Sequence, residues 1–201
     1  MSLRARKAKH KRDVPVSGLA PVATREHLRA LARRRFLASE RLSLEELAAE
    51  LGISRATAYR WAGNAELLAA EVIAEIVEET FHRTLREARG RGAERIIDAT
   101  ARGMRYIATS APYRAFIAGD PQKALRIVAS KEAPVQSRTI ALNQRLIEEE
   151  IASGALELPV DAHTMAYALV RIAESFLYAD IIAGEKPDLD KAVEILRLML
   201  R

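Results

Sequence analysis

Apolar residues recur along most of the chain at the three- and four-residue spacing of amphipathic helices, and no segment shows strong β-strand alternation. The clearest case is residues 65–88, which carry two apolar rows. These rows are Leu68, Val72 and Ile76, and then Ile73, Val77, Phe81 and Leu85. Because a helix with two apolar rows packs against two partners, this segment can join two parts of the protein.

Residues that begin and end helices divide this pattern into ten segments. Serine, asparagine or aspartate precedes several of the apolar runs as an N-cap, proline opens others, and glycine follows many of them. The predicted helices cover residues 25–38, 43–51, 54–61, 65–88, 93–110, 112–119, 121–130, 134–154, 161–183 and 189–200. The predicted fold class is therefore all-α.

One pair of short helices has the spacing of a helix-turn-helix. It spans Ser43 to Trp61, with the sequence SLEELAAELGISRATAYRW. Ser43 and Glu46 form a predicted capping box, Gly52 allows the sharp turn, and Ser54 caps the second helix. The apolar face of the first helix is Leu44, Leu47, Ala48 and Leu51. This motif predicts DNA as the partner, with one helix in the major groove.

The second helix of the pair places Ala58 inward and leaves polar residues on or near the outer surface. Arginine can bond to guanine O6 and N7, the threonine methyl can touch thymine, and serine and tyrosine hydroxyls can hold phosphates. The predicted DNA-binding residues are Ser43, Ser54, Arg55, Thr57, Tyr59 and Arg60. The alternative is an ordinary helical hairpin whose outer face is solvated.

The charge distribution favours the DNA interpretation. Residues 1–62 hold 14 Lys and Arg against 6 Asp and Glu, whereas residues 63–201 hold 18 against 21. A basic run lies within residues 4–12: Arg4, Arg6, Lys7, Lys9, His10, Lys11 and Arg12. We expect this arm to be disordered when free and to follow a groove or phosphates, or else to be a solubilising tail. In residues 25–38, Leu28, Leu31, Ala32 and Phe36 face the hairpin, whereas Arg29, Arg33, Arg34 and Arg35 stay solvated or meet phosphate.

These observations predict three parts: a basic arm (residues 1–23), a DNA-binding domain (24–64) and a helical effector-binding and dimerisation domain (65–201). The chain of 201 residues has no cysteine, no apolar run long enough for a membrane span, and no signal-peptide core at its start. We therefore expect a cytoplasmic protein that does not bind membranes.

No pattern in the chain indicates catalysis. The four histidines are scattered, and no HExxH, GxSxG or glycine-rich phosphate loop occurs. The run Glu148-Glu149-Glu150 is interpreted as a solvated helix face rather than a metal site. We predict no catalytic residue, no metal site and no cofactor.

The helix-turn-helix and the start of the long helix after it resemble the TetR family of transcriptional repressors. The matching residues are Thr57-Ala58-Tyr59, then Trp61, then NAELL with Glu66-Leu67-Leu68 at the start of the long helix. The resemblance covers about residues 24–75, and the C-terminal part is similar to the branch named for quorum-signal degradation. Two features depart from the family pattern: the turn after Trp61 is one residue shorter, and Ala65 lies where a lysine often provides a phosphate contact.

The resemblance implies a repressor that binds a palindromic operator in double-stranded DNA and is released by a small hydrophobic or amphipathic effector. It also implies a homodimer formed through the last two helices. Apolar residues available for this interface are Met165, Ala168, Leu169, Ile172, Phe176, Leu177, Ile181, Val193, Leu196, Met199 and Leu200. The predicted ligand-binding residues are Met104, Ile107, Tyr113, Phe116, Ile172 and Phe176.

A second class of function fits the same basic N-terminal segment. A helical scaffold or surface-binding protein could use the arm for charge-driven, non-specific binding to nucleic acid or a membrane. Sequence dependence distinguishes the two classes, because charge-only binding depends on salt and not on base sequence.

Overall fold

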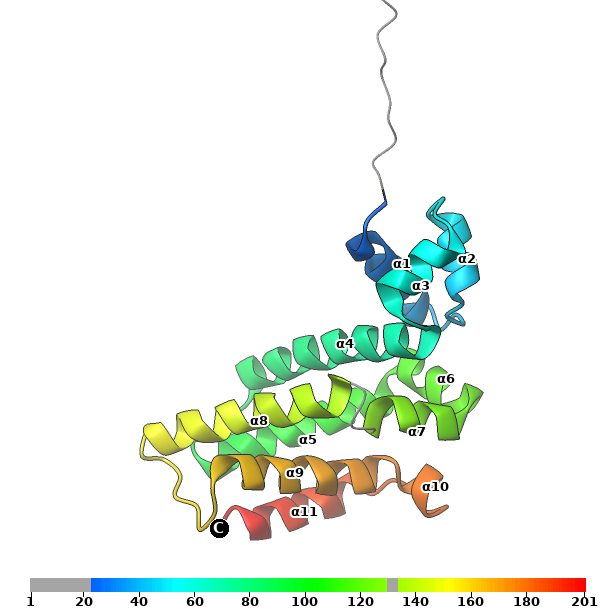
Figure 1. The fold of residues 1–201 in the computed structure, drawn as a ribbon. Coiled ribbons are helices and arrows are strands. Elements are labelled where there is room, and N and C mark those ends of the chain that lie inside the picture. The colour runs from blue at the N-terminus through cyan, green and yellow to red at the C-terminus, as the bar shows by residue number, and fades with distance from the viewer. Residues whose placement is uncertain (1–22, 130–133) are drawn as a thin grey trace, which may run out of the picture.

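The described residues of the computed structural model are 23–129 and 134–201, and they form eleven helices and no strand (Figure 1). The all-α prediction is confirmed. The helices are α1 (Arg25–Leu37), α2 (Leu44–Glu50), α3 (Arg55–Ala62), α4 (Ala65–Glu87), α5 (Ala93–Thr109), α6 (Ala111–Gly119), α7 (Pro121–Ala129), α8 (Pro134–Ala152), α9 (Ala162–Leu177), α10 (Ala179–Ile182) and α11 (Leu189–Met199). The predicted basic run, residues 4–12, lies outside the described residues.

Helices α1, α2 and α3 form a small head at one end of the molecule (Figure 1). The four apolar residues of α1 that were predicted to face inward are all buried. They share one cluster with Leu44 and Leu47 of α2 and with Ala58 of α3. The head is therefore held by apolar packing between its three short helices.

Helix α4 runs from the head along the rest of the protein, which we call the body (Figure 1). Leu68, Val72 and Ile73 are almost completely buried, in the same cluster as the apolar residues of the head. That cluster also contains Tyr113 and Tyr178 from the body. The apolar core of the head is therefore continuous with that of the body through α4.

The body consists of long helices laid side by side, with the short helices α6, α7 and α10 at the end near the head (Figure 1). Helix α8 packs against α4 and α9, and α11 packs against α5 and α9. A second apolar cluster fills this part and includes Ile96, Ile147, Leu169 and Leu196. None of the helices in residues 23–129 and 134–201 is both long and apolar enough to cross a membrane.

Most predicted helix starts agree with the caps in the structure. Ser54, Asn64, Asp161 and Asp188 each accept a hydrogen bond from a backbone N–H of the turn that they begin. The predicted capping box at Ser43 forms only in part. The Ser43 side chain accepts from the Glu46 N–H, but the Glu46 carboxylate accepts from Arg35 at 2.7 Å instead of returning to Ser43.

The predicted single helix over residues 161–183 is wrong. The chain leaves helical geometry at Tyr178, which has φ −109° and ψ 22°, and it resumes as α10. The Tyr178 side chain is buried and its hydroxyl lies 2.7 Å from that of Tyr113, while α10 contacts α7. Apolar spacing continues through the break, so periodicity does not reveal it.

The four arginines of α1 that were expected to stay solvated or meet phosphate, Arg29, Arg33, Arg34 and Arg35, keep 18–71% of their side chains exposed, and each is paired with a carboxylate. Arg34 and Arg35 pair with Glu50 of α2, inside the head. The other two reach α4: Arg29 lies 3.4 Å from Glu75, and Arg33 makes a two-bond pair with Glu79 at 2.6 Å each. The Arg29–Glu75 and Arg33–Glu79 pairs therefore connect the head to α4.

A buried carboxylate fixes the corner between α4 and α5. The Glu150 side chain accepts from the Gly92 N–H at 2.7 Å and from Arg95, and Glu150 is 5% exposed. Burial opposes the charge, but these two donors outweigh it and lower the pKa of Glu150. The prediction that the whole run 148–150 is solvated is therefore wrong at Glu150, although Glu148 and Glu149 are exposed.

We predict that Gly92→Ala destabilises the protein by at least about 2 kcal/mol. Gly92 has φ +58°, and a Cβ there would lie 2.0 Å from the Ala155 carbonyl oxygen. Urea unfolding of the full chain measures the change. Gly119→Ala is the control, because a Cβ there meets no heavy atom within 4 Å. Its effect should stay within about 1 kcal/mol, and equal stability of the two variants would contradict the prediction.

Candidate DNA-binding surface and ligand cavity

The turn between α2 and α3 has the geometry that the sequence predicts for a helix-turn-helix. Gly52 has φ +65°, and a Cβ added there would meet nothing within 4 Å. The backbone conformation, and not crowding, is therefore what favours glycine. The Ile53 N–H donates to the Ala48 carbonyl at 3.0 Å, and the Ser54 hydroxyl accepts from the Thr57 N–H at 3.1 Å. These bonds set the direction in which α3 leaves the turn.

Helix α3 is divided into a buried and an exposed side. Ala58 is fully buried against the head, whereas Arg55, Tyr59 and Arg60 are exposed. Thr57 is half-buried, and its hydroxyl lies 2.9 Å from the Ser54 hydroxyl. We call Arg55, Tyr59 and Arg60 the outer edge of α3.

Glu45 of α2 bonds to two of the predicted DNA-binding residues. The Tyr59 hydroxyl donates to one of its carboxylate oxygens at 2.8 Å, and the Ser43 hydroxyl donates to the other at 3.1 Å. Hydrogen bonds from its own backbone N–H, from Tyr59 and from Ser43 lower the pKa of the Glu45 carboxyl. The carboxylate therefore stays ionised and holds the Tyr59 ring on the surface of the head.

The arginines of the head fall into two groups. All four interior arginines of α1, from Arg29 to Arg35, lie within 4 Å of a carboxylate. Among the described residues, no carboxylate lies within 4 Å of the Arg55 or Arg60 guanidinium. The outer edge of α3 therefore presents two cations that form no close ion pair with a carboxylate of the described residues.

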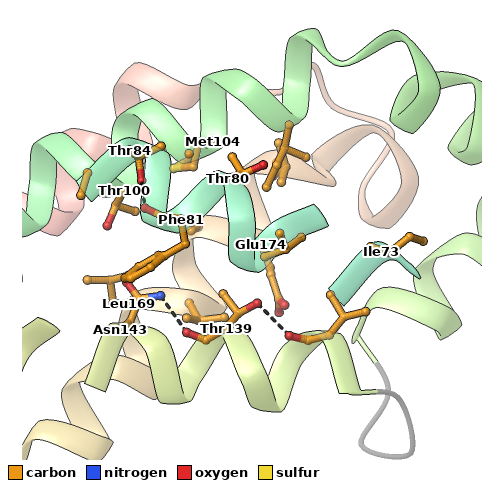
Figure 2. Close-up of a pocket in the computed structure, with 18 of the residues that line it drawn as sticks. Ile73, Thr80, Phe81, Thr84, Thr100, Met104, Thr139, Asn143, Leu169 and Glu174 are labelled. Atoms are coloured by element: carbon orange, nitrogen blue, oxygen red, sulfur yellow. Dashed lines mark hydrogen bonds between the residues drawn. The ribbon is translucent and has the colours of Figure 1, made fainter. Parts of the chain in front are cut away.

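The body contains a partly open cavity between α4, α5, α8 and α9, which we call the central cavity (Figure 2). The volume of the cavity that is open to the centres of water molecules is about 100 Å³. Apolar side chains form much of its wall, including Ile73, Phe81, Met104 and Leu169. It is therefore large enough for a small molecule, and its lining is mainly apolar with a few polar groups, as in most ligand sites.

The polar groups of the central cavity come from facing helices. Thr80 and Thr84 lie on α4, Thr139 and Asn143 on α8, and Glu174 on α9 (Figure 2). The Glu174 carboxylate accepts from Gln136 at 3.0 Å and from Arg171 at 2.8 Å. Burial nevertheless raises the pKa of Glu174. A carboxyl group therefore lies at the wall of a mostly apolar chamber.

Two tyrosines, Tyr113 of α6 and Tyr178 after α9, line the cavity. The hydroxyls of Tyr113 and Tyr178 lie 2.7 Å apart, and burial raises the pKa of both phenols. Both side chains are therefore neutral at physiological pH. The ring of Tyr113 contacts that of Phe116, and Phe116 contacts Phe36 of the head, with centroids 6.3 Å and 5.7 Å apart. A continuous run of aromatic contacts therefore leads from the cavity to α1.

A second cavity, which we call the head cavity, lies between α1 and the body. Phe36 and Leu37 form its wall on the side of the head, and Ile76, Arg83 and Tyr106 form part of the wall opposite. The volume of the head cavity, measured in the same way, is about 190 Å³. The packing of the head on the body is therefore incomplete at this junction.

Comparisons with known proteins agree with this geometry. A sequence profile described as "Tetracyclin repressor-like, C-terminal domain" matches residues 91–201. The structure is similar to that of the transcriptional repressor QsdR of R. erythropolis, from the TetR family, with 30% identity and a TM-score of 0.84. The match covers 88% of this chain and 93% of that one. The chain belongs to the TetR family of transcriptional regulators.

Two more distant solved structures share the fold. A TetR-family regulator of Pectobacterium atrosepticum is 21% identical with a TM-score of 0.62, covering 88% of this chain and 92% of that one. The TetR-family repressor AlkX of Dietzia is 19% identical with a TM-score of 0.56, covering 91% and 98%. No curated protein sequence matches significantly. Because TetR-family proteins are transcription factors and not enzymes, the prediction of a non-catalytic protein is confirmed.

The structure brings together three of the six residues that were predicted to bind ligand. Met104, Ile107 and Tyr113 line the central cavity. Phe116 does not; it packs between Tyr113 and Phe36. The other two, Ile172 and Phe176, lie half-buried on α9 and are not part of the cavity wall. The side of α9 that lines the chamber is centred on Val170, Ala173 and Glu174 instead.

The apolar residues that were predicted for a dimer interface lie in two environments. Met165, Leu169, Leu196 and Leu200 are buried in the second cluster of the monomer. Others of that set, such as Ile172 and Val193, are half-buried. The most exposed large apolar side chain on α11 is Leu198, at 61%, and Tyr167 on α9 is 51% exposed. Neither was among the predicted interface residues.

The sequence contained a signal for the polar cavity residues that the ligand prediction missed. On α4, Thr80 and Thr84 are four residues apart and interrupt apolar rows, and Thr139 and Asn143 do the same on α8. Polar side chains at inward positions of amphipathic helices need partners, which a cavity or a ligand can supply. The predicted ligand-binding residues were aromatic and apolar and did not include these positions.

Proposed function

We propose that this TetR-family protein is a homodimeric repressor that binds a palindromic operator and is released by a small effector in the central cavity. The observation that carries the proposal is one continuous connection. The outer edge of α3 is exposed and cationic. The head that contains α3 is bonded to α4 through Arg33 and Glu79, and α4 also lines the central cavity. A ligand that displaces α4 therefore displaces the DNA-binding surface.

The proposed DNA contacts follow from the side chains on the outer edge. Arg55 and Arg60 contact base edges in the major groove, with Thr57 against a thymine methyl. Tyr59, Ser54 and Ser43 contact phosphates, with Tyr59 exchanging its bond to Glu45 for a phosphate oxygen. Two heads read two half-sites when their α3 helices lie about 34–36 Å apart, or a multiple of that distance.

The proposed dimer uses α9 and α11, the two long helices near the C-terminus. Both carry exposed apolar side chains, Tyr167 and Leu198, whose burial needs a partner beyond the monomer. Two helices from each of two chains would form a four-helix interface. A symmetric pair also supplies the two heads that a palindrome requires.

Release follows from a difference in affinity between two positions of the head. An effector that fits the cavity better when α4 is displaced shifts the population away from the DNA-binding form. The aromatic contacts from Tyr113 through Phe116 to Phe36 give a second route from the cavity to the head. Both routes end on α1, which packs against α2 and α3.

Arg55→Ala and Arg60→Ala should each relax operator preference at particular base pairs, by about 1–3 kcal/mol. Titrations of the full chain with operator selected from random DNA, and with its point variants, measure this at one fixed salt concentration. Arg34→Ala is the control, because Arg34 is already paired with Glu50. We expect it to leave base preference unchanged.

Two results of this experiment would count against the proposal. A uniform loss of affinity across all sequences would make Arg55 and Arg60 phosphate contacts. A wild-type protein that prefers no palindrome by about 10³-fold or more over random DNA would be a charge-driven binder instead of an operator-specific repressor.

Leu198→Glu should convert the dimer to a folded monomer, because it places a charge on the large apolar side chain that is most exposed among the described residues. Light scattering after size-exclusion chromatography measures the mass, and circular dichroism checks the helices. Leu67→Glu is the control, since Leu67 is 41% exposed at the start of α4, away from α9 and α11. A Leu198 variant that stays dimeric would contradict the proposed interface.

Glu79→Ala should loosen the head without unfolding the protein. Its carboxylate makes both bonds to Arg33, but it is 63% exposed, so the pair is worth at most about 1 kcal/mol. Amide hydrogen exchange in α1–α3 should therefore rise about two- to fivefold. Glu78→Ala is the control, because Glu78 pairs only within α4. Unchanged exchange in the Glu79 variant would remove this pair from the mechanism.

A further inference from the structure

We propose that the central cavity selects a ligand with a hydrogen-bond donor head, best a protonated amine, on an apolar body, and that it discriminates against carboxylates. The inference rests on the proposed function, because it names the chemical class of the effector. It comes from counting donors and acceptors on the cavity wall (Figure 2).

The four threonines of the wall have no donor left for a ligand. Each hydroxyl donates to a carbonyl oxygen of its own helix: Thr80 to Ile76, Thr84 to Phe81, Thr100 to Ile96 and Thr139 to Val135, at 2.7–2.8 Å. A hydroxyl has one donor and two acceptor lone pairs. Towards the cavity, these four oxygens can therefore only accept.

Asn143 adds a further acceptor. Its amide nitrogen donates to the Thr139 carbonyl at 2.8 Å, drawn as a dashed line in Figure 2. No described residue donates to its amide oxygen. Because Asn143 is 5% exposed and lines the cavity, its amide oxygen is an acceptor that a ligand in the cavity can reach.

Within the described ranges, Glu174 supplies the only carboxylate on the wall. Both of its donors, Gln136 and Arg171, bond to the same oxygen, Oε2. Among the described residues no donor reaches Oε1. The side chain is 15% exposed and lines the cavity, so a ligand in the chamber can reach this carboxyl group.

Few donors balance these acceptors. No lysine or arginine lines the central cavity in the described part of the chain. One of the Tyr113 and Tyr178 hydroxyls donates its hydrogen to the other, so one O–H remains to donate to a ligand. The Asn143 amide nitrogen likewise keeps one N–H. A ligand that brings only acceptors therefore leaves most of these oxygens without a partner, which is unfavourable in a buried site.

Charge leads to the same conclusion. A ligand carboxylate would share a mostly apolar chamber with Glu174 and find no cation among the described residues of the wall. A protonated amine would bring up to three donors and form a charge-assisted bond to Oε1. An apolar body fits the remaining wall, which includes Ile73, Phe81 and Leu169.

The test compares straight-chain probes that differ only in the head group: the C6, C8 and C10 amines, alcohols and carboxylates at pH 7. Thermal shift of the full-length protein gives the affinity of each probe, and operator release is measured in parallel. At each length, we expect the amine to bind most tightly and the carboxylate most weakly.

Glu174→Gln keeps the shape of the side chain and removes its charge. In this variant, affinity for the amines should fall about ten- to a hundredfold, whereas affinity for the alcohols should stay within about threefold. Glu157→Gln is the control, because Glu157 is exposed in the loop before α9. The melting temperature without probe verifies that each variant folds.

Three outcomes would overturn the inference: carboxylates that bind as tightly as amines, amine affinity that is unchanged in Glu174→Gln, or no binding by any amine. None of these depends on DNA. Failure of the proposed function would appear separately, as wild-type protein that binds amines but neither prefers an operator nor releases it.

Discussion

The packing of α4 is the constraint on which the rest of the structure depends. Leu68, Val72 and Ile73 bury one side of this helix in a cluster that contains both head and body residues. Further along, Phe81 and Thr84 of the same helix form the cavity wall. Because protein interiors are close-packed, a helix that packs against the head and also forms the cavity wall cannot shift at one end without disturbing the other.

The ion pairs between head and body have a different role from the apolar packing. Arg29, Arg33 and their partners on α4 are partly exposed, and exposed pairs contribute little stability. The two-bond geometry between Arg33 and Glu79 does, however, restrict orientation. Apolar contacts therefore hold the head on the body, the pairs align it, and the unfilled head cavity leaves space for it to move.

The sequence predicted the helices well because caps and glycines act locally. The starts at Ser54, Asn64 and Asp161 and the turn at Gly52 depend only on neighbouring residues. The contacts that the sequence did not predict join distant segments. Arg33 pairs with Glu79, and the Gly92 N–H donates to Glu150, only in the folded chain. The break at Tyr178 likewise accompanies a bond to Tyr113, 65 residues away.

The candidate site was predictable in part for the same reason. The exposed side of α3 follows from one short helix, whereas the cavity requires knowing which faces of several helices meet. Polar residues at inward positions, such as Thr84, Asn143 and Glu174, reduce the apolar burial that stabilises a helical core. Natural chains keep such residues where function requires them. Departures from the apolar pattern, more than the pattern itself, therefore mark where the chain recognises something other than itself.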